Sequence, residues 1–155
     1  MADKGKSKVI RCADYTFPGI EKKEYKESSG GFKAICRYAL LGNNDGEEAL
    51  NFHTRYFDIE PGGYSSLEYH RHPHTVVVIR GSGTVILDDE VKEITLHDTV
   101  YVAPNTIHQF IADRGEPLGF ICVVDRYRDR PSAPNEKEIR EQIGNGEAAG
   151  RIKKE

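Results

Sequence analysis

Four side chains of the kinds that bind transition metals lie within one seven-residue stretch near the middle of the chain. They are Glu68, His70, His72 and His74, so three of the six histidines fall at every second position. One carboxylate and several neutral imidazoles form a ligand set that divalent first-row metal ions accept. Such a density is unusual for a solvent-exposed surface, and it predicts a metal site.

The backbone around this stretch is expected to bring the ligands together. In an extended strand alternate side chains share a face, so Glu68 and His70 would point the same way. Pro73 lacks an amide donor and favours a turn just after His72. His74 would then lie at the start of the returning strand, within reach of the first pair.

The returning strand is expected to be short. Residues 75–79 are mostly β-branched and apolar, which is typical of a buried strand. The segment Gly81-Ser82-Gly83 that follows is a turn signal, so we expect the strand to end there. The segment Pro61-Gly62-Gly63 predicts a similar break ahead of the ligands.

The spacing of these residues resembles the first motif of the cupin superfamily. The matching positions are Gly62, Glu68, His70, His74 and Gly81, where that family usually has Gly, His, His, Glu and Gly. Glu68 and His74 are therefore exchanged relative to the usual order. The inventory of one carboxylate and several imidazoles is retained.

A second register of the same motif takes His70 and His72 as its paired histidines. The dipeptide His72-Pro73 is typical of many family members. This register requires a two-residue insertion and a matching deletion, whereas the ungapped one keeps both flanking glycines in step. We favour the ungapped register and keep His72 as an alternative ligand.

Residues 97–108 resemble the second cupin motif, and His108 matches its last metal ligand. The departures from the family pattern are His97 for Gly, Ala103 for Pro, Asn105 for Gly and Ala112 for Asn. Asn105 is a mild change because asparagine tolerates the positive φ that a turn glycine supplies. Together the two motifs cover residues 51 to 125.

The resemblance implies one divalent transition metal ion bound by Glu68, His70, His74 and His108. Mn, Fe, Zn, Ni, Co and Cu all accept this ligand set, so the identity of the ion stays open. The set contains no thiolate, and it would leave one or two coordination positions for water or substrate.

This site leads us to expect a metal-dependent, dioxygenase-like enzyme that acts on a small organic substrate. The alternatives are a noncatalytic cupin that binds a small molecule or a metal, a sugar isomerase or epimerase, and a barrel that has lost its metal. The first motif and fold do not choose between them, because one fold supports many reactions.

Composition favours a soluble cytoplasmic protein of one domain. The chain has 155 residues and a net charge of −3, without a long run of either sign, which argues against nucleic acid as a partner. No apolar stretch is long enough for a membrane span or a signal peptide. Three widely spaced cysteines, Cys12, Cys36 and Cys122, do not indicate a disulfide framework, and the last two are assigned to the core.

Short strands with turn residues between them predict an all-β fold, and the resemblance names a double-stranded β-helix, the jelly-roll cupin barrel. We divide the chain into a partly flexible N-terminal arm at 1-31, the barrel at 32-128, and a short helix with a flexible tail at 129-155. The helix is expected at residues 136–143. In cupins such N-terminal strands often pair across a dimer, so the resemblance implies a homodimer.

Several further residues receive expectations from the strand pattern. His53 and His97 are assigned to surface or loop positions, and Tyr56, Tyr69, Tyr101 and Gln109 to packing near the site. The predicted core residues are Phe52, Phe57, Val76, Val78, Phe110, Phe120 and Val124.

Overall fold

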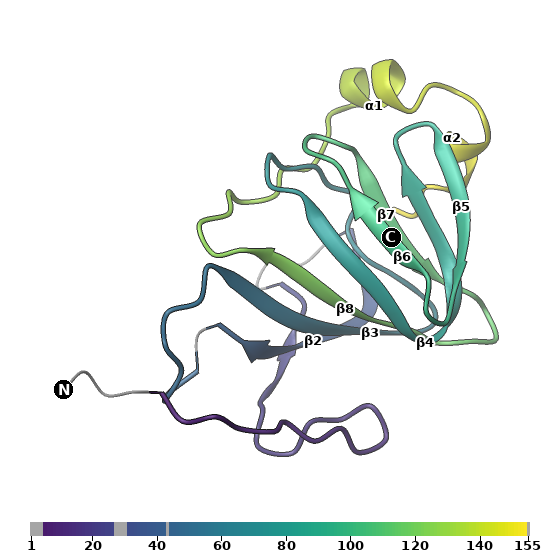
Figure 1. The fold of residues 1–155 in the computed structure, drawn as a ribbon. Helices are drawn as coiled ribbons and strands as arrows, with labels where there is room; N and C mark the ends of the chain where they lie inside the picture. Colours follow the sequence, from purple (N-terminus) through teal and green to yellow (C-terminus); the bar gives the residue numbers. More distant parts are fainter. Residues whose placement is uncertain (1–4, 27–30, 43, 155) are drawn as a thin grey trace.

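The computed structural model describes residues 5–26, 31–42 and 44–154, and it shows a closed β-barrel with two short helices outside it (Figure 1). The strands are β1 (Lys22–Glu24), β2 (Lys33–Leu41), β3 (Phe52–Tyr64), β4 (His74–Leu87), β5 (Glu90–Thr95), β6 (Thr99–Val102), β7 (His108–Ala112) and β8 (Leu118–Asp125). The helices are α1 (Glu136–Gln142) and α2 (Glu147–Arg151). The strands form one sheet with antiparallel pairing, so the all-β jelly-roll expectation is confirmed.

Two long strands close the barrel because each of them takes part in both walls. The first part of β3 pairs with β8, whereas Tyr64 at its end pairs with β7. The first part of β4 pairs with β6 and β8, and its second part pairs with β5 and β7. In Figure 1, β4 runs the length of the barrel.

Two glycine-containing segments bend these strands rather than end them. The expected break at residues 61–63 and the expected turn at residues 81–83 are both wrong, since β3 continues to Tyr64 and β4 to Leu87. Gly62 and Gly81 have φ values of +77° and +64°, in the left-handed region that glycine adopts without strain. Such bends let one strand leave one wall and enter the other.

The core lies between the walls and is lined by aromatic rings. The Phe57 and Phe120 rings stack with centroids 5.5 Å apart, and Phe110 lies 4.7 Å from Phe120. These residues were expected in the core, as were Val76, Val78 and Val124, and all six are buried. Phe52 was expected there too, but it lies at the open start of β3 and is 45% exposed.

The N-terminal arm packs along the outside of β2 and β3 (Figure 1). Phe17 is buried there, with its ring 5.2 Å from those of Tyr38 and Tyr56. Strand β1 pairs with β2 slightly earlier in the chain than the strand expected near residues 24–26. Expectations for residues 1–4 and 28–30 fall outside the described residues.

The C-terminal segment is more ordered than the sequence predicted. Asn135 and Glu138 form a reciprocal capping box at the start of α1, close to where the helix was expected. Disorder was expected from residue 145 onward, but α2 forms instead and buries Ala148 completely. Within the described part of the chain, no helix is long and apolar enough to cross a membrane.

A buried amide explains why the tail lies where it does. Gln109 on β7 is fully buried, and its side chain must therefore find hydrogen-bond partners inside the protein. Its Nε2 donates to the carbonyl oxygens of Ser65 and Lys153, and its Oε1 accepts from the Lys153 amide. The tail thus completes the hydrogen bonding of a barrel strand.

The Gly81 bend yields a prediction about stability. A Cβ atom at Gly81 would lie 1.7 Å from the carbonyl oxygen of Pro117, and the φ value there is also unfavourable for alanine. We expect Gly81→Ala to lower the free energy of unfolding by about 2–5 kcal/mol, measured by urea denaturation. Gly115→Ala is the matched control, because nothing lies within 4 Å of its Cβ position; equal stability of the two variants would contradict the prediction.

Candidate metal centre

Four histidines gather at one end of the barrel: His70 and His72 lie on the segment between β3 and β4, His74 begins β4, and His108 begins β7. The backbones of Glu68 and His108 exchange two hydrogen bonds, and those of Tyr69 and Ser132 exchange two more. Glu68 and His70 were expected on one extended strand, but residues 65–73 form only these isolated bridges. The expected turn after His72 is present, and β4 begins at His74.

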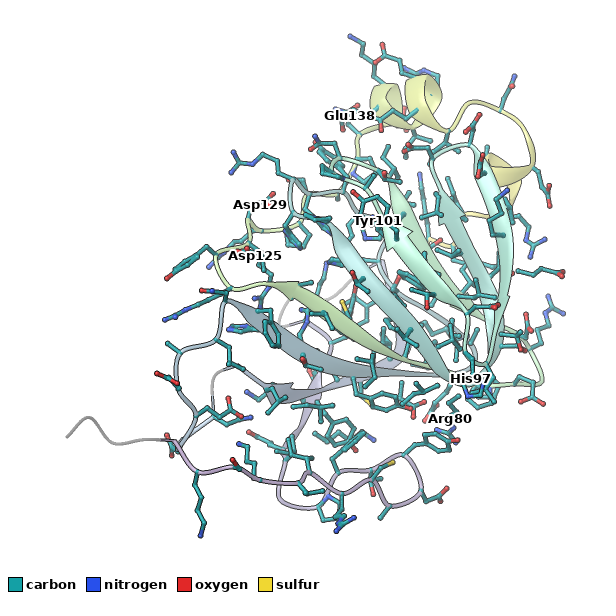
Figure 2. The ribbon with its side chains drawn as sticks, in the orientation of Figure 1. Arg80, His97, Tyr101, Asp125, Asp129 and Glu138 are labelled. Carbon is teal, nitrogen blue, oxygen red and sulfur yellow. The ribbon has the colours of Figure 1, made fainter. Side chains whose placement is uncertain are left out.

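Figure 2 places this end of the barrel relative to the rest of the molecule. Asp125 and Asp129 lie where β8 ends and β4 begins, whereas Arg80 and His97 lie at the opposite end. Asp129 accepts a hydrogen bond from the His72 ring, so it belongs to the histidine cluster. His97 is exposed, as expected from the sequence, and is remote from the cluster.

Two of the imidazoles are held by hydrogen bonds from their Nδ1 atoms to backbone carbonyl oxygens. The Nδ1 of His70 donates to the His72 carbonyl oxygen at 2.6 Å, and the Nδ1 of His108 donates to the Thr106 carbonyl oxygen at 2.8 Å. Because a carbonyl oxygen can only accept, each Nδ1 must carry the proton. Each Nε2 is then left with a lone pair, which is the form that binds a metal ion.

The Nε2 atom of His70 is the strongest indication of a metal site. It is buried and has no hydrogen-bond partner among the described residues. A buried polar atom without a partner is costly, and a bound cation would satisfy it. The ligand atoms of His70, His72 and His74 lie within 4.8 Å of one another, as do those of Glu68, His70 and His108.

The residues favoured from the sequence are thus brought together, and His72 joins them. The His70 ring centroid lies 4.4 Å from that of His74 and 4.8 Å from that of His108. Asp129 accepts from the His72 Nδ1 at 2.9 Å, so the Nε2 of His72 faces His74 at 3.2 Å. That contact joins two ring nitrogens, and it needs either one shared proton or a cation between them.

Glu68 is held by the ammonium group of Lys26. Its Oε2 accepts from Lys26 Nζ at 2.5 Å and from Ser66 Oγ at 2.7 Å. Burial raises the pKa of Glu68, but the positive charge of Lys26, together with the hydrogen bonds from Lys26 and Ser66, outweighs this and lowers the pKa below the usual range. Glu68 is therefore a carboxylate, with one oxygen engaged by Lys26 and the other available to the cluster.

The cluster is kept neutral by its surroundings. Burial lowers the pKa of His70 to about 4. Burial also lowers the pKa values of His74 and His108 below that of a free imidazole. These three rings are neutral at physiological pH, so no proton must be displaced before a metal binds.

A cavity of 1090 Å³ opens onto the cluster. The side chains of Glu68, His72, His74 and His108 form one part of its lining, and Phe57, Phe110 and Phe120 form an apolar part. Other lining residues were not predicted from the sequence, namely Lys26, Arg55, Cys122, Arg128 and Asp129. Arg55 could have been predicted to line the cavity, because residues two apart on a strand share a face and Phe57 was expected in the core.

The remaining expectations near the site have mixed outcomes. His53 was assigned to the surface or a loop, but it is only 7% exposed and lines the cavity, so that assignment is wrong. Tyr56 donates to Asp58, and Tyr69 donates to Glu138, both outside the metal cluster. Tyr101 is 65% exposed (Figure 2).

Comparison with known proteins agrees with this geometry. The cupin domain family matches residues 55–124. The chain is also 35% identical over 142 residues to a 1-methylthio-D-xylulose 5-phosphate methylsulfurylase from Rhodospirillum rubrum, covering 90% of this chain and 88% of the relative. This chain belongs to the cupin superfamily.

Two solved cupin structures resemble this cupin closely along the whole chain. A cupin 2 domain-containing protein from Halorhodospira halophila is 44% identical, with a TM-score of 0.73, covering 96% of this chain and 97% of the other. A cupin 2 conserved barrel domain protein from Rhodopseudomonas palustris is 32% identical, with a TM-score of 0.84, covering 96% of this chain and 100% of the other. The similarity therefore includes the arm and the C-terminal segment as well as the barrel.

The contact between Asp129 and His72 yields a prediction about metal affinity. A carboxylate that accepts from Nδ1 fixes the tautomer and raises the basicity of Nε2. If His72 is a ligand of this cupin, we expect Asp129→Asn to weaken Zn²⁺ binding about 10–100-fold in a competitive titration with a chromophoric chelator. Asp89→Asn, at an exposed turn, is the control. Unchanged affinity of Asp129→Asn would show that His72 does not contribute.

Proposed function

We propose that this cupin is a metal-dependent enzyme that acts on a small phosphorylated sugar bearing a methylthio group. The observation that carries the metal dependence is the convergence of several imidazole Nε2 atoms and one carboxylate beside a cavity. The substrate class rests on the relative from Rhodospirillum rubrum, whose name specifies 1-methylthio-D-xylulose 5-phosphate and whose similarity spans nearly the whole chain.

Each residue of the site has a defined part in this proposal. A divalent ion bound there would act as a Lewis acid toward a substrate carbonyl or enolate oxygen. His70, His74 and His108 would hold the ion as neutral donors, with His72 as a further candidate. Lys26 keeps Glu68 ionised and oriented, and Ser66, which donates to Glu68, accepts from the Tyr25 hydroxyl at 3.0 Å.

The cavity wall suits such a substrate. The rings of Phe57, Phe110 and Phe120 supply an apolar surface against which a methylthio group can pack. Burial raises the pKa of Tyr25, so its hydroxyl stays protonated and donates to Ser66 beside Glu68.

A dioxygenase is the second candidate function. The group formed by Glu68, His70 and His108 contains two histidines and one carboxylate, which is the ligand set of non-haem iron oxygenases. Noncatalytic binding and isomerisation stay open as alternatives. The homodimer and the cytoplasmic location expected from the sequence stay predictions.

Metal content tests the first half of the proposal. We expect the protein, purified without chelator or histidine tag, to carry about one equivalent of a transition metal by elemental analysis. His70→Ala and His108→Ala should each lose most of it, whereas His97→Asn, remote from the cluster, should retain it. We also expect metal at about 100 times its Kd to stabilise the wild-type protein by about 2.7 kcal/mol. A metal-free wild type that gains no stability from any added ion would refute metal dependence.

Turnover tests the second half. Samples loaded with Mn, Fe, Co, Ni, Cu or Zn are incubated with 1-methylthio-D-xylulose 5-phosphate, with and without a small thiol that could accept the methylthio group. We expect at least one sample to replace the S-methyl proton signal of the substrate by a new one, and Glu68→Gln to abolish this change. Oxygen uptake by the Fe(II) sample without loss of the S-methyl signal would favour the dioxygenase. If neither oxygen uptake nor a change in the S-methyl signal is observed, noncatalytic binding is favoured.

A further inference from the structure

Arginines form the wall of the cavity beyond the metal cluster. Arg55 lies on the inward face of β3, where its backbone pairs with that of Cys122 on β8. Arg126 and Arg128 lie in the segment that follows β8, and all three arginines line the same 1090 Å³ cavity as His74 and His108. The cavity therefore has a metal-binding part and a strongly basic part.

The basic part is not neutralised by carboxylates of the protein. Among residues 5–26, 31–42 and 44–154, none forms an ion pair with Arg55, Arg126 or Arg128. The two carboxylates that line the cavity are engaged elsewhere, Glu68 by Lys26 and Asp129 by His72. Arg55 and Arg128 are half-buried, whereas Arg126 is exposed. Half-buried guanidinium groups without an ion-pair partner are unusual in a folded protein.

Arg55 is held in place but keeps hydrogen-bonding capacity. Its guanidinium carbon lies 5.0 Å above the Phe57 ring, and its Nη2 donates weakly to Cys122 Sγ at 3.5 Å. Its Nε is buried and has no hydrogen-bond partner in the described part of the chain. A pre-oriented guanidinium of this kind can donate two parallel hydrogen bonds to an oxyanion.

Arg128 and His53 add further donors. The Nη1 of Arg128 donates to His53 Nδ1 at 3.0 Å and to the Asp125 carbonyl oxygen at 3.2 Å. Because His53 Nδ1 accepts this bond, the ring proton lies on Nε2. That atom is buried beside Gly42 and also lacks a partner among the described residues, so it is a second unsatisfied donor, on a residue that lines the cavity.

The positive charges of this cluster lower the pKa values of its members. Burial lowers the pKa of Arg128, and the positive charge of Arg55 lowers it further. Burial likewise lowers the pKa of His53, followed by the charges of Arg128 and Arg55. The groups repel one another, and an anion between them would relieve that repulsion.

We propose that Arg55, Arg128 and His53 form an anion subsite that binds the phosphate group of a phosphate monoester substrate. This inference rests on the proposed function, because it assigns the part of the same cavity that would hold the far end of that substrate. A phosphate dianion supplies enough acceptor oxygens for two guanidinium forks and an imidazole donor. Binding it here would direct the other end of a short sugar chain toward the histidines and so position the reacting carbon.

Phosphate binding by the metal-free protein is the direct test, because it does not depend on the metal or on turnover. The protein is stripped with chelator, its metal content is checked, and inorganic phosphate and xylulose 5-phosphate are titrated in by calorimetry in a phosphate-free buffer. We expect one equivalent of either ligand to bind and neutral xylulose to bind more weakly. Arg55→Gln and Arg128→Gln should each weaken the binding of both ligands about tenfold or more.

Matched controls make the outcome decisive. Arg114→Gln removes the same charge from an exposed loop outside the cavity and should change affinity less than about twofold. Arg55→Lys keeps the charge but not the fork, and it should recover part of the lost affinity. Circular dichroism checks that each variant is folded; if Arg55→Gln does not fold, Arg128→Gln carries the test alone. No phosphate binding, or equal weakening in Arg114→Gln, would overturn the subsite, whereas loss of turnover with phosphate binding intact would overturn only the proposed function.

Discussion

The candidate metal centre depends on the hydrogen bonds that hold the Nδ1 atoms of three histidines. His70 and His108 each donate to a carbonyl oxygen two residues away, and His72 donates to Asp129. These bonds fix the tautomer, so the Nε2 atoms of these rings are the ones available to a metal ion. Lone pairs that face one another repel, so this arrangement of neutral rings is stabilised when a cation lies between them.

The barrel brings these side chains together by placing the segment that carries His70 and His72 between two bent strands. The bends at Gly62 and Gly81 carry β3 and β4 from one wall to the other, which closes the sheet. Closure leaves an interior lined by stacked phenylalanines and open at one end. The crossing segment then needs only isolated backbone bridges to Ser132 and His108 to hold its position.

The charges of the cavity are segregated rather than paired. Glu68 and Asp129 are each held by a cation or an imidazole donor, whereas Arg55 and Arg128 face the same space without carboxylate partners. A cavity whose carboxylates are engaged, while Arg55 and Arg128 have no ion-pair partner among the described residues, is suited to an anionic ligand. A metal ion at one end and a basic wall beyond it would bind a small phosphorylated molecule at two points. That arrangement matches the substrate named for the relative from Rhodospirillum rubrum.

The strand pattern and the grouping of Glu68, His70 and His74 follow from the sequence, because alternation and ligand spacing are local properties of the chain. The jelly-roll class and the choice of His108 as a further candidate ligand came from the resemblance to the cupin motifs. Tertiary structure decided what depends on distant partners. It placed Asp129 against His72, turned His53 and Arg55 into the cavity, and ordered the tail through the buried amide of Gln109. It also decided that the glycine segments bend strands rather than end them. A local glycine signal permits either outcome, and only pairing with strands from elsewhere in the chain selects one.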